Sequence, residues 1–409
     1  MRKLIKRILV AIAVVGPGLF LIGYNIGTGS VTTMAKTGAE HGMGLLWVLA
    51  LSAIFTYVLM VAYGKMTLVT GRTALYNIKT GFKKGGWLLA LYIMLALIVG
   101  EMLAIIGIMG IVADLIREGI RMTTDIIVQP FWIILVITVI MYELMWYGQY
   151  RSLEKVLVFF VILMGLSFLV VFISVKPSFV VLAEGLIPRI PDKNFGLIAA
   201  IAGTTCSAAV FIMRSTIVAE KGWTINDLKI EKKDSLVSAS VMLLLSAVIM
   251  AVAAGTLHIM GLKLDNTTEM IALFEPIGGK TAAFILILGI VGAGLSSIFP
   301  IALITPWLVA DFTGKPRNLQ SSQSRIFILI ALLISFGSVF LEQRPPALML
   351  FSQAFQACIL PAVTIPIFIL LNRKGLMGSH CASYKDNIWL VAVIVFSFFT
   401  SWYAIAELI

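Results

Sequence analysis

The stretch GPGLFLIGYNIGTGS, from Gly16 to Ser30, lies inside the first long apolar segment of the chain and decides how that segment folds. It contains five glycines, a proline, an asparagine, a threonine and a serine. Glycine weakens a helix and allows a solute to approach the backbone closely. A helix that only anchors a protein has no need of these residues, so we predict that this helix is interrupted at GTGS (27–30).

Around this stretch, the chain has the composition of a membrane protein. Hydrophobic residues make up 60% of its 409 residues and charged residues 12%, which excludes a water-soluble globular protein. Eleven apolar segments are long enough to cross a bilayer core of about 30 Å. They cover residues 8–34, 44–68, 86–116, 127–148, 153–175, 195–218, 234–257, 281–310, 325–342, 346–371 and 387–409. We predict a single all-α polytopic transmembrane unit over residues 1–409, with no separate soluble domain.

The distribution of basic residues predicts the orientation. If the N-terminus is cytoplasmic, 20 of the 31 Lys and Arg residues fall in cytoplasmic segments and nine in the opposite loops. Cytoplasmic loops are enriched in Lys and Arg, so we expect the N-terminus inside and the C-terminus outside. The basic start MRKLIKR leads into a long span without a cleavage pattern, so we expect no removed leader. The net charge of +11 then reflects topology and lipid headgroups, not nucleic-acid binding.

A second small-residue interruption, AGTTCSAA (202–209), lies in the sixth apolar segment. It follows five spans and precedes five more, so each half of the chain begins with an interrupted helix. Such paired interruptions are typical of inverted-repeat transporters, whose substrate site lies where the two broken helices meet. We predict a 5+5 inverted repeat, with halves at 8–175 and 195–371 and an eleventh helix at 387–409. We expect the charged loop between Glu220 and Ser235 to lie along the membrane surface.

Unwound backbone inside a membrane needs a ligand or a water-lined cavity, because an unpaired peptide group costs several kcal/mol in hydrocarbon. Small residues also pack helices against one another, and each interruption taken alone is compatible with that simpler role. Their matched positions favour a substrate site. The polar candidates around it are Asn25, Gly27, Thr28, Gly29, Ser30, Thr204, Thr205, Ser207 and Gln353.

Six motifs along the chain occur in an order that resembles one known family. They are VGPGL (15–19), GLLWVLALS (44–52), LVTGRTAL (68–75), GQYRSLEKVL (148–157), SQAFQACILPAVTIPIFIL (352–370) and LMG (376–378). The sequence thereby resembles the Nramp family of proton-coupled divalent-metal transporters. The resemblance implies the LeuT-like fold, with helices 1 and 6 unwound in the middle of the membrane.

The metal-binding motifs of that family are absent, so the sequence resembles an atypical member. The family's Asp-Pro-Gly-Asn tetrad of helix 1, whose acid and amide coordinate metal, is matched by Gly27–Ser30. Its Met-Pro-His run of helix 6 is matched by Ser207–Ala209, and its second histidine by Arg214. Of the two acids that serve the family's proton route in helix 3, Glu101 stands at the first position and Ala104 replaces the second.

These replacements leave the metal ligands undetermined. Hydroxyls, backbone carbonyls and an amide suit a hard cation that keeps some of its water, and Mg²⁺ dehydrates reluctantly. Transition metals gain from sulfur or nitrogen ligands. Cys206 would add a thiolate, although a lone cysteine in a membrane helix is more often a small apolar residue. Gln353 and Gln356, with Ser296 and Ser297, either face the central cavity or hydrogen-bond between helices.

Two charged residues are expected at membrane depth, where ionisable groups usually face partners or water. Glu101 lies in the third span and Arg214 in the cytoplasmic half of the sixth. One interpretation is that Glu101 exchanges protons, as the coupling group, and that Arg214 gates it or fixes its pKa. The other is that the two form a static structural ion pair.

We therefore predict a secondary transporter that works by alternating access. By resemblance its substrate is a divalent cation, most readily a hard or hydrated one such as Mg²⁺, with proton symport as an open question. By residue chemistry a small neutral or zwitterionic solute, such as an amino acid or carboxylate, also fits, because helix ends cradle carboxylates. A third interpretation is a transport-dead sensor.

Other classes of function find little support in the sequence. An intramembrane enzyme needs a nucleophile and a base at membrane depth, and Glu101 and Arg214 are the only deep ionisable residues expected. We therefore predict no enzyme activity and no cofactor. The expected partners are the transported solute or cation and the lipid bilayer, with no nucleic acid. The oligomeric state stays open, a monomer included.

Overall fold

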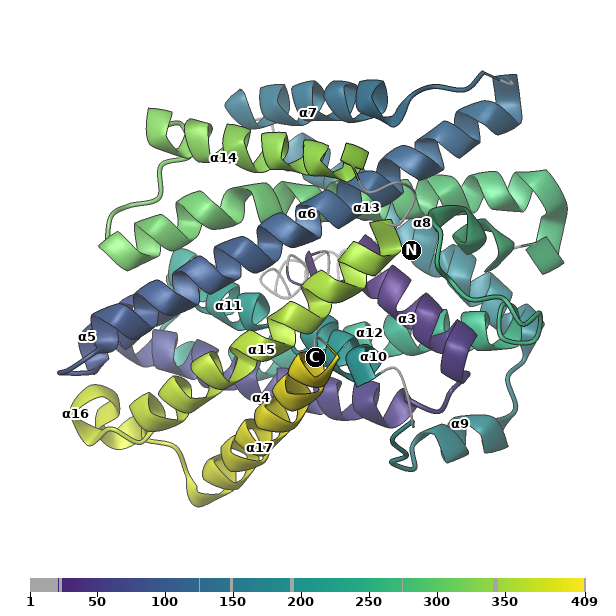
Figure 1. The fold of residues 1–409 in the computed structure, drawn as a ribbon. Helices are drawn as coiled ribbons and strands as arrows, with labels where there is room; N and C mark the ends of the chain where they lie inside the picture. The colour runs from purple at the N-terminus through teal and green to yellow at the C-terminus, as the bar shows by residue number, and fades with distance from the viewer. Residues whose placement is uncertain are drawn as a thin grey trace, which may run out of the picture.

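The computed structural model describes residues 21, 24–124, 126–147, 150–191, 195–273, 275–340 and 345–407, and these form helices joined by turns (Figure 1). No β-strand occurs among these residues, so the predicted all-α class is confirmed. The α-helices are α3 (Thr28–His41), α4 (Leu46–Thr70), α5 (Ala74–Gly81), α6 (Gly86–Thr124), α7 (Pro130–Trp146), α8 (Tyr150–Val175), α9 (Phe179–Gly185), α10 (Phe195–Thr205), α11 (Ala208–Glu220), α12 (Leu228–Gly255), α13 (Glu275–Thr313), α14 (Ser322–Ile334), α15 (Pro345–Leu371), α16 (Lys374–Met377) and α17 (Tyr384–Ala406). The 3-10 helices are η1 (Ile225–Asp227), η2 (Thr267–Leu273), η3 (Ser335–Phe340) and η4 (Gly378–His380).

Eight helical segments in the described part are long and apolar enough to cross a membrane. The pair α8 and α9, bent by 115°, gives a ninth if it is counted as one span. The shorter apolar helix α7 and helix α3 occupy two further predicted spans. Each of the eleven predicted spans therefore contains a helix, and the chain is an integral membrane protein.

The first span is broken, slightly earlier than predicted. Tyr24 and Asn25 are helical, Ile26 and Gly27 are not, and α3 begins at Thr28. Gly27 is the N-cap, and its carbonyl accepts a hydrogen bond of 3.1 Å from the backbone nitrogen of Val31. The polar stretch after Gly27 thus forms the first turn of α3, where backbone N–H groups have no acceptor within the helix. The GPG motif itself lies outside the described residues.

The sixth span breaks within the predicted stretch. Helix α10 ends at Thr205 and α11 begins at Ala208, so Cys206 and Ser207 separate two half-helices. Ser207 is the N-cap of α11 and has an extended backbone. The unwinding of helices 1 and 6 that the resemblance implies is therefore present.

The long helices cross around these two breaks (Figure 1). Helix α15 packs against both α6 and α10, while α12 packs against α3 and α4. Helices α7 and α14 lie together along one edge, and α17 lies beside α15. The third span of each predicted half forms a 39-residue helix, α6 and α13, and these two also pack together. Their equal length supports the repeat, whose boundaries remain a prediction.

The segment predicted as a charged surface loop is partly helical and partly buried. After the capped turn η1, helix α12 begins at Leu228, six residues before the predicted span. Glu231 and Asp234 are 0% and 2% exposed. Residues three positions apart lie on one face of a helix, and this face turns inward. The interpretation of the whole segment as a surface loop was therefore wrong.

Candidate functional site

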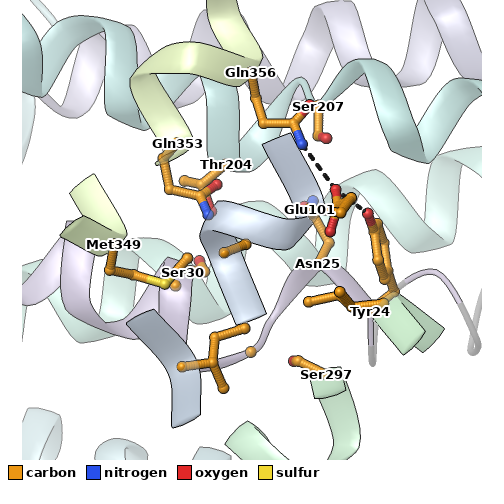
Figure 2. Close-up of a pocket in the computed structure, with 15 residues that line it drawn as sticks. Tyr24, Asn25, Ser30, Glu101, Thr204, Ser207, Ser297, Met349, Gln353 and Gln356 are labelled. Carbon is orange, nitrogen blue, oxygen red and sulfur yellow. Dashed lines mark hydrogen bonds between the residues drawn. The ribbon is translucent and has the colours of Figure 1, made fainter. Parts of the chain in front are cut away.

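A cavity lies where the two broken helices face α6 and α15 (Figure 2). It leaves about 40 Å³ open to the centres of water molecules, enough for a few waters or for a cation with part of its hydration shell. Its lining residues are Tyr24, Asn25, Gly27, Gly29, Ser30, Glu101, Ala104, Ile108, Thr204, Ser207, Ser297, Ile301, Met349, Gln353 and Gln356.

Glu101 supplies the only carboxyl group among these lining residues, and two neighbours hold it in place (Figure 2). The Tyr24 hydroxyl donates to its Oε1 at 2.5 Å, and Nε2 of Gln356 donates to the same oxygen at 2.8 Å. All three side chains are more than nine-tenths buried. The arrangement joins α6, α15 and the helical residues before the first break, so movement of any of these elements alters the surroundings of the carboxyl group.

The end of α10 is held by the first span and by α4. The carbonyl oxygen of Thr205 accepts hydrogen bonds from Nδ2 of Asn25 at 3.3 Å and from Oγ1 of Thr56 at 2.8 Å. Carbonyls in the last turn of a helix have no partner within the helix. The side chains of Asn25 and Thr56 provide hydrogen-bond donors for this carbonyl. The bond from Asn25 also joins the two breaks directly.

Glycines at the breaks permit close approach between helices. A Cβ atom on Gly27 would lie 1.8 Å from Oγ of Ser297, and one on Gly29 would lie 2.5 Å from Cε of Met349. On α10, a Cβ atom on Gly203 would lie 1.8 Å from the backbone oxygen of Gln353. A larger residue at Gly203 would therefore have to push the backbone of α15 away from α10.

Most of the predicted site residues line this cavity. Those that do are Asn25, Gly27, Gly29, Ser30, Glu101, Thr204, Ser207 and Gln353. Thr28 and Thr205 are buried beside the cavity but are not among its lining residues, because their positions in the half-helices direct them into neighbouring packing. Of the residues left open between two roles, Gln356 and Ser297 line the cavity and Ser296 does not.

Tyr24 and Met349 also line the cavity and were not predicted from the sequence. Tyr24 directly precedes Asn25, and its position beside the break could have identified it as a lining residue. Met349 lies four residues before Gln353 and seven before Gln356, on one face of α15. Helical spacing from the two glutamines would have identified it.

A comparison with known sequences decides the family. The family described as Nramp, natural resistance-associated macrophage protein-like, matches residues 18–407. The chain belongs to the Nramp family. This match confirms the resemblance to the Nramp family that the six sequence motifs indicated.

Similar proteins cover nearly the whole chain. The divalent metal cation transporter MntH of Pectobacterium carotovorum is 24% identical over 381 residues, which cover 90% of this chain and 88% of that protein. The crystal structure of a manganese transporter mutant from Eremococcus coleocola is similar with a TM-score of 0.75 and 16% identity, and covers 97% of this chain and 86% of that one. Mhp1, a nucleobase-cation-symport-1 family transporter, has a TM-score of 0.61 and 14% identity, over 96% of this chain and 92% of that one. These likenesses confirm the LeuT-like fold.

The lining residues of the cavity in this Nramp family member do not include a cluster of metal-ligating side chains. Among the described residues, no three His, Cys, Asp or Glu side chains are grouped to hold a metal ion. Cys206 is completely buried in the second break and does not line the cavity. The polar groups of the wall are instead amides, hydroxyls and the single Glu101 carboxyl.

Arg214 does not pair with Glu101, and the static pair considered for these two residues is wrong. Its Nε and Nη2 atoms donate to the two carboxylate oxygens of Glu231 at 2.9 and 2.6 Å, and Nη1 donates to Asp234. Arg214 is 0% exposed, and a buried guanidinium needs such partners. Both partners come from the start of α12, a segment that was predicted to be a surface loop.

Glu101 and Arg214 are not the only buried ionisable residues in the described part of the chain. Asp114 and Asp311 are buried as well, together with the two partners of Arg214. Asp311 receives hydrogen bonds from Thr216 and Arg317, and Arg317 also reaches Glu220 at 2.6 Å. Helix α11 is thus bound through charged or polar contacts to both α12 and the end of α13.

Proposed function

We propose that this Nramp family member is a secondary transporter that carries a divalent cation through the cavity at the two helix breaks, by alternating access. Relatives over nearly the full chain are named divalent metal cation transporters, and a structural neighbour is a manganese transporter. The observation that carries the proposal is the position of the cavity. It lies beside both breaks, with Gly27 and Ser207 in its wall, and Glu101 supplies a carboxyl group there.

We propose further that the cation is hard and remains partly hydrated, as Mg²⁺ would. The wall offers amide oxygens from Asn25 and Gln353 and hydroxyls from Ser30, Thr204 and Ser207. Neutral oxygens around one carboxylate bind a hydrated hard cation through its water molecules. They are poorer ligands for a transition metal that has lost its water. Met349 brings one thioether to the wall, which keeps Mn²⁺ as the competing cargo.

A small zwitterionic or carboxylate solute is the second candidate. The first turn of α3 carries Gly29 and Ser30 at the cavity wall, and the free N–H groups and partial positive charge of a helix N-terminus favour a carboxylate. The amide of Gln353 and the hydroxyl of Ser207 would meet the rest of such a solute. The third candidate function is a sensor that binds a cation without transporting it.

Flux of Mg²⁺ and Mn²⁺ into proteoliposomes of purified protein, run side by side, tests the proposal. Magnesium flux that saturates and exceeds that of protein-free vesicles supports the hard-cation proposal, and manganese flux without magnesium would overturn it. No flux of either ion in protein that still binds Mg²⁺ would indicate the sensor. Neither flux nor binding, in folded protein, would overturn the cation proposal and direct the search to amino acids and carboxylates.

A further inference from the structure

The amide nitrogen of Asn25 makes two hydrogen bonds inside the protein. Nδ2 donates to the backbone oxygen of Thr205 at 3.3 Å and to Sδ of Met242 at 3.2 Å. A side-chain amide carries two N–H donors and one oxygen acceptor. Both donors of Asn25 are therefore in use, and Oδ1 is the group that remains for a ligand in the cavity that Asn25 lines (Figure 2).

The same two partners determine which way round the amide lies. A backbone carbonyl oxygen accepts hydrogen bonds and cannot donate, and a thioether sulfur is likewise an acceptor without a hydrogen. If the amide were turned over, Oδ1 of Asn25 would face the oxygen of Thr205 and the sulfur of Met242, and both hydrogen bonds would be lost. The hydrogen-bond network therefore assigns the orientation of this amide.

Met242 belongs to a face of α12 that supports the first break. Ser246 lies one turn further along the helix, and its Oγ is 3.3 Å from Oγ of Ser30. Residues four positions apart lie on one face of a helix. Met242 and Ser246 are buried, and neither is among the residues that line the cavity. Helix α12 thus contacts two lining residues, Asn25 and Ser30, from outside the cavity.

Other donors of the cavity wall are also directed at acceptors within the protein. The Tyr24 hydroxyl and one N–H of Gln356 donate to Glu101. The Ser297 hydroxyl donates to a backbone oxygen of its own helix at 3.1 Å. The other lining hydroxyls and the amide of Gln353 can turn and act as donors or acceptors. The fixed groups therefore favour a substrate that needs acceptors, as a hard cation does, over a carboxylate, which needs donors.

We propose that Met242 is a positioning residue that, together with the backbone oxygen of Thr205, holds the amide of Asn25 with Oδ1 toward the transported ion, so that the cavity selects a cation over a carboxylate. Met242 acts through Asn25 and does not contact the substrate itself. The amide oxygen is a ligand of the kind that hard cations bind. The inference rests on the proposed function and narrows its substrate class.

A double-mutant cycle on Mg²⁺ binding, measured by calorimetry, tests whether Met242 acts through Asn25. Met242→Leu removes the sulfur acceptor and keeps a side chain of similar volume. We expect the Kd to rise about fivefold in Met242→Leu and about tenfold in Asn25→Ala, as for one lost polar contact each. In the double variant the Kd should equal that of Asn25→Ala. Additive effects would overturn the proposal, because a purely structural role of Met242 does not depend on the Asn25 amide.

Met250 provides the matched control on the same helix. It is completely buried in α12, and its sulfur accepts no hydrogen bond from the described residues. Met250→Leu should leave the Kd for Mg²⁺ unchanged, while Met242→Leu raises it. Met242→Gln keeps an acceptor at the position of the sulfur, so its Kd should lie closer to that of the unmodified protein. Equal effects of the two leucine variants, or a Kd in Met242→Gln as high as in Met242→Leu, would overturn the proposal.

Carboxylate probes test the substrate class. Glycine and acetate, titrated into the unmodified protein, should show no saturable binding, whereas Mg²⁺ should. Saturable binding of either probe that Asn25→Ala weakens would overturn the selection of a cation. Failure of the proposed function is a separate outcome, because an unmodified protein that neither binds nor transports Mg²⁺ counts against that function. Magnesium binding that is insensitive to both Asn25→Ala and Met242→Leu would overturn only the inference about Met242.

Discussion

Nη2 of Arg214 lies 2.6 Å from Oε2 of Glu231, and both side chains are completely buried. The ion pair joins α11, the half-helix after the second break, to the first turn of α12. Gly64 of α4 makes room for it, because a Cβ atom there would lie 2.0 Å from Oε1 of Glu231. Arg214 is therefore one end of a structural connection between two helices.

Loss of that connection should destabilise the protein strongly. Arg214→Leu leaves two buried carboxylates without their cation, and breaking a buried pair in this way costs about 3–5 kcal/mol. Thermal unfolding in detergent measures the change. The control is Arg121→Leu, an exposed arginine that pairs with Glu118 at 3.4 Å, where we expect at most about 1 kcal/mol. Similar shifts for the two variants would contradict the assignment.

Gly203 should tolerate alanine far less well than Gly29. A methyl group at Gly203 meets the backbone oxygen of Gln353 at 1.8 Å, whereas one at Gly29 meets the flexible ends of Met349 and Gln353. Overpacking against a backbone typically costs about 1–3 kcal/mol, while side-chain ends can move aside. Unfolding midpoints of the two alanine variants, measured together, check the order. If Gly29→Ala is the more destabilised, α10 and α15 do not approach as described.

Ser207 and Thr28 should behave differently although the sequence placed both at the site. Ser207 lines the cavity, so Ser207→Ala should weaken Mg²⁺ binding by about fivefold, as expected for one lost contact of about 1 kcal/mol. The Thr28 hydroxyl is buried without a partner among the described residues. Thr28→Val should therefore leave binding unchanged and leave stability equal or higher. Weaker binding in Thr28→Val would instead restore Thr28 as a ligand.

Thiol labelling tests the predicted orientation and the role of Cys206 together. Cys381 lies between α16 and α17, on the side expected to be cytoplasmic, and is half-buried, whereas Cys206 is completely buried. A membrane-impermeant thiol reagent should label Cys381 only from the cytoplasmic side, and labelling from the outside would contradict the orientation. Cys206→Ala should leave the preference between Mg²⁺ and Mn²⁺ unchanged. A changed preference would show that the thiol acts on the cation.

Several features of this protein followed from the sequence because their causes are local. Long apolar runs fix where helices cross, since the backbone must satisfy its hydrogen bonds internally in lipid. Glycine and small polar residues mark both breaks, although the first lies at Ile26 and Gly27, slightly before the centre of its polar stretch. The candidate cavity residues beside these breaks, such as Asn25 and Ser207, followed from the same pattern.

Tertiary structure decided which side chains meet. Glu101 and Gln356 are 255 positions apart and become neighbours only because α6 packs against α15. The partners of Arg214 lie in a segment whose charged residues are typical of a solvated loop. They are buried because helix α12 turns the face that carries them inward. Local propensity determines helices and breaks, but pairing between distant polar groups depends on how the helices pack. The sequence alone therefore predicted the two breaks beside which the cavity lies, and the fold determined which groups line that cavity.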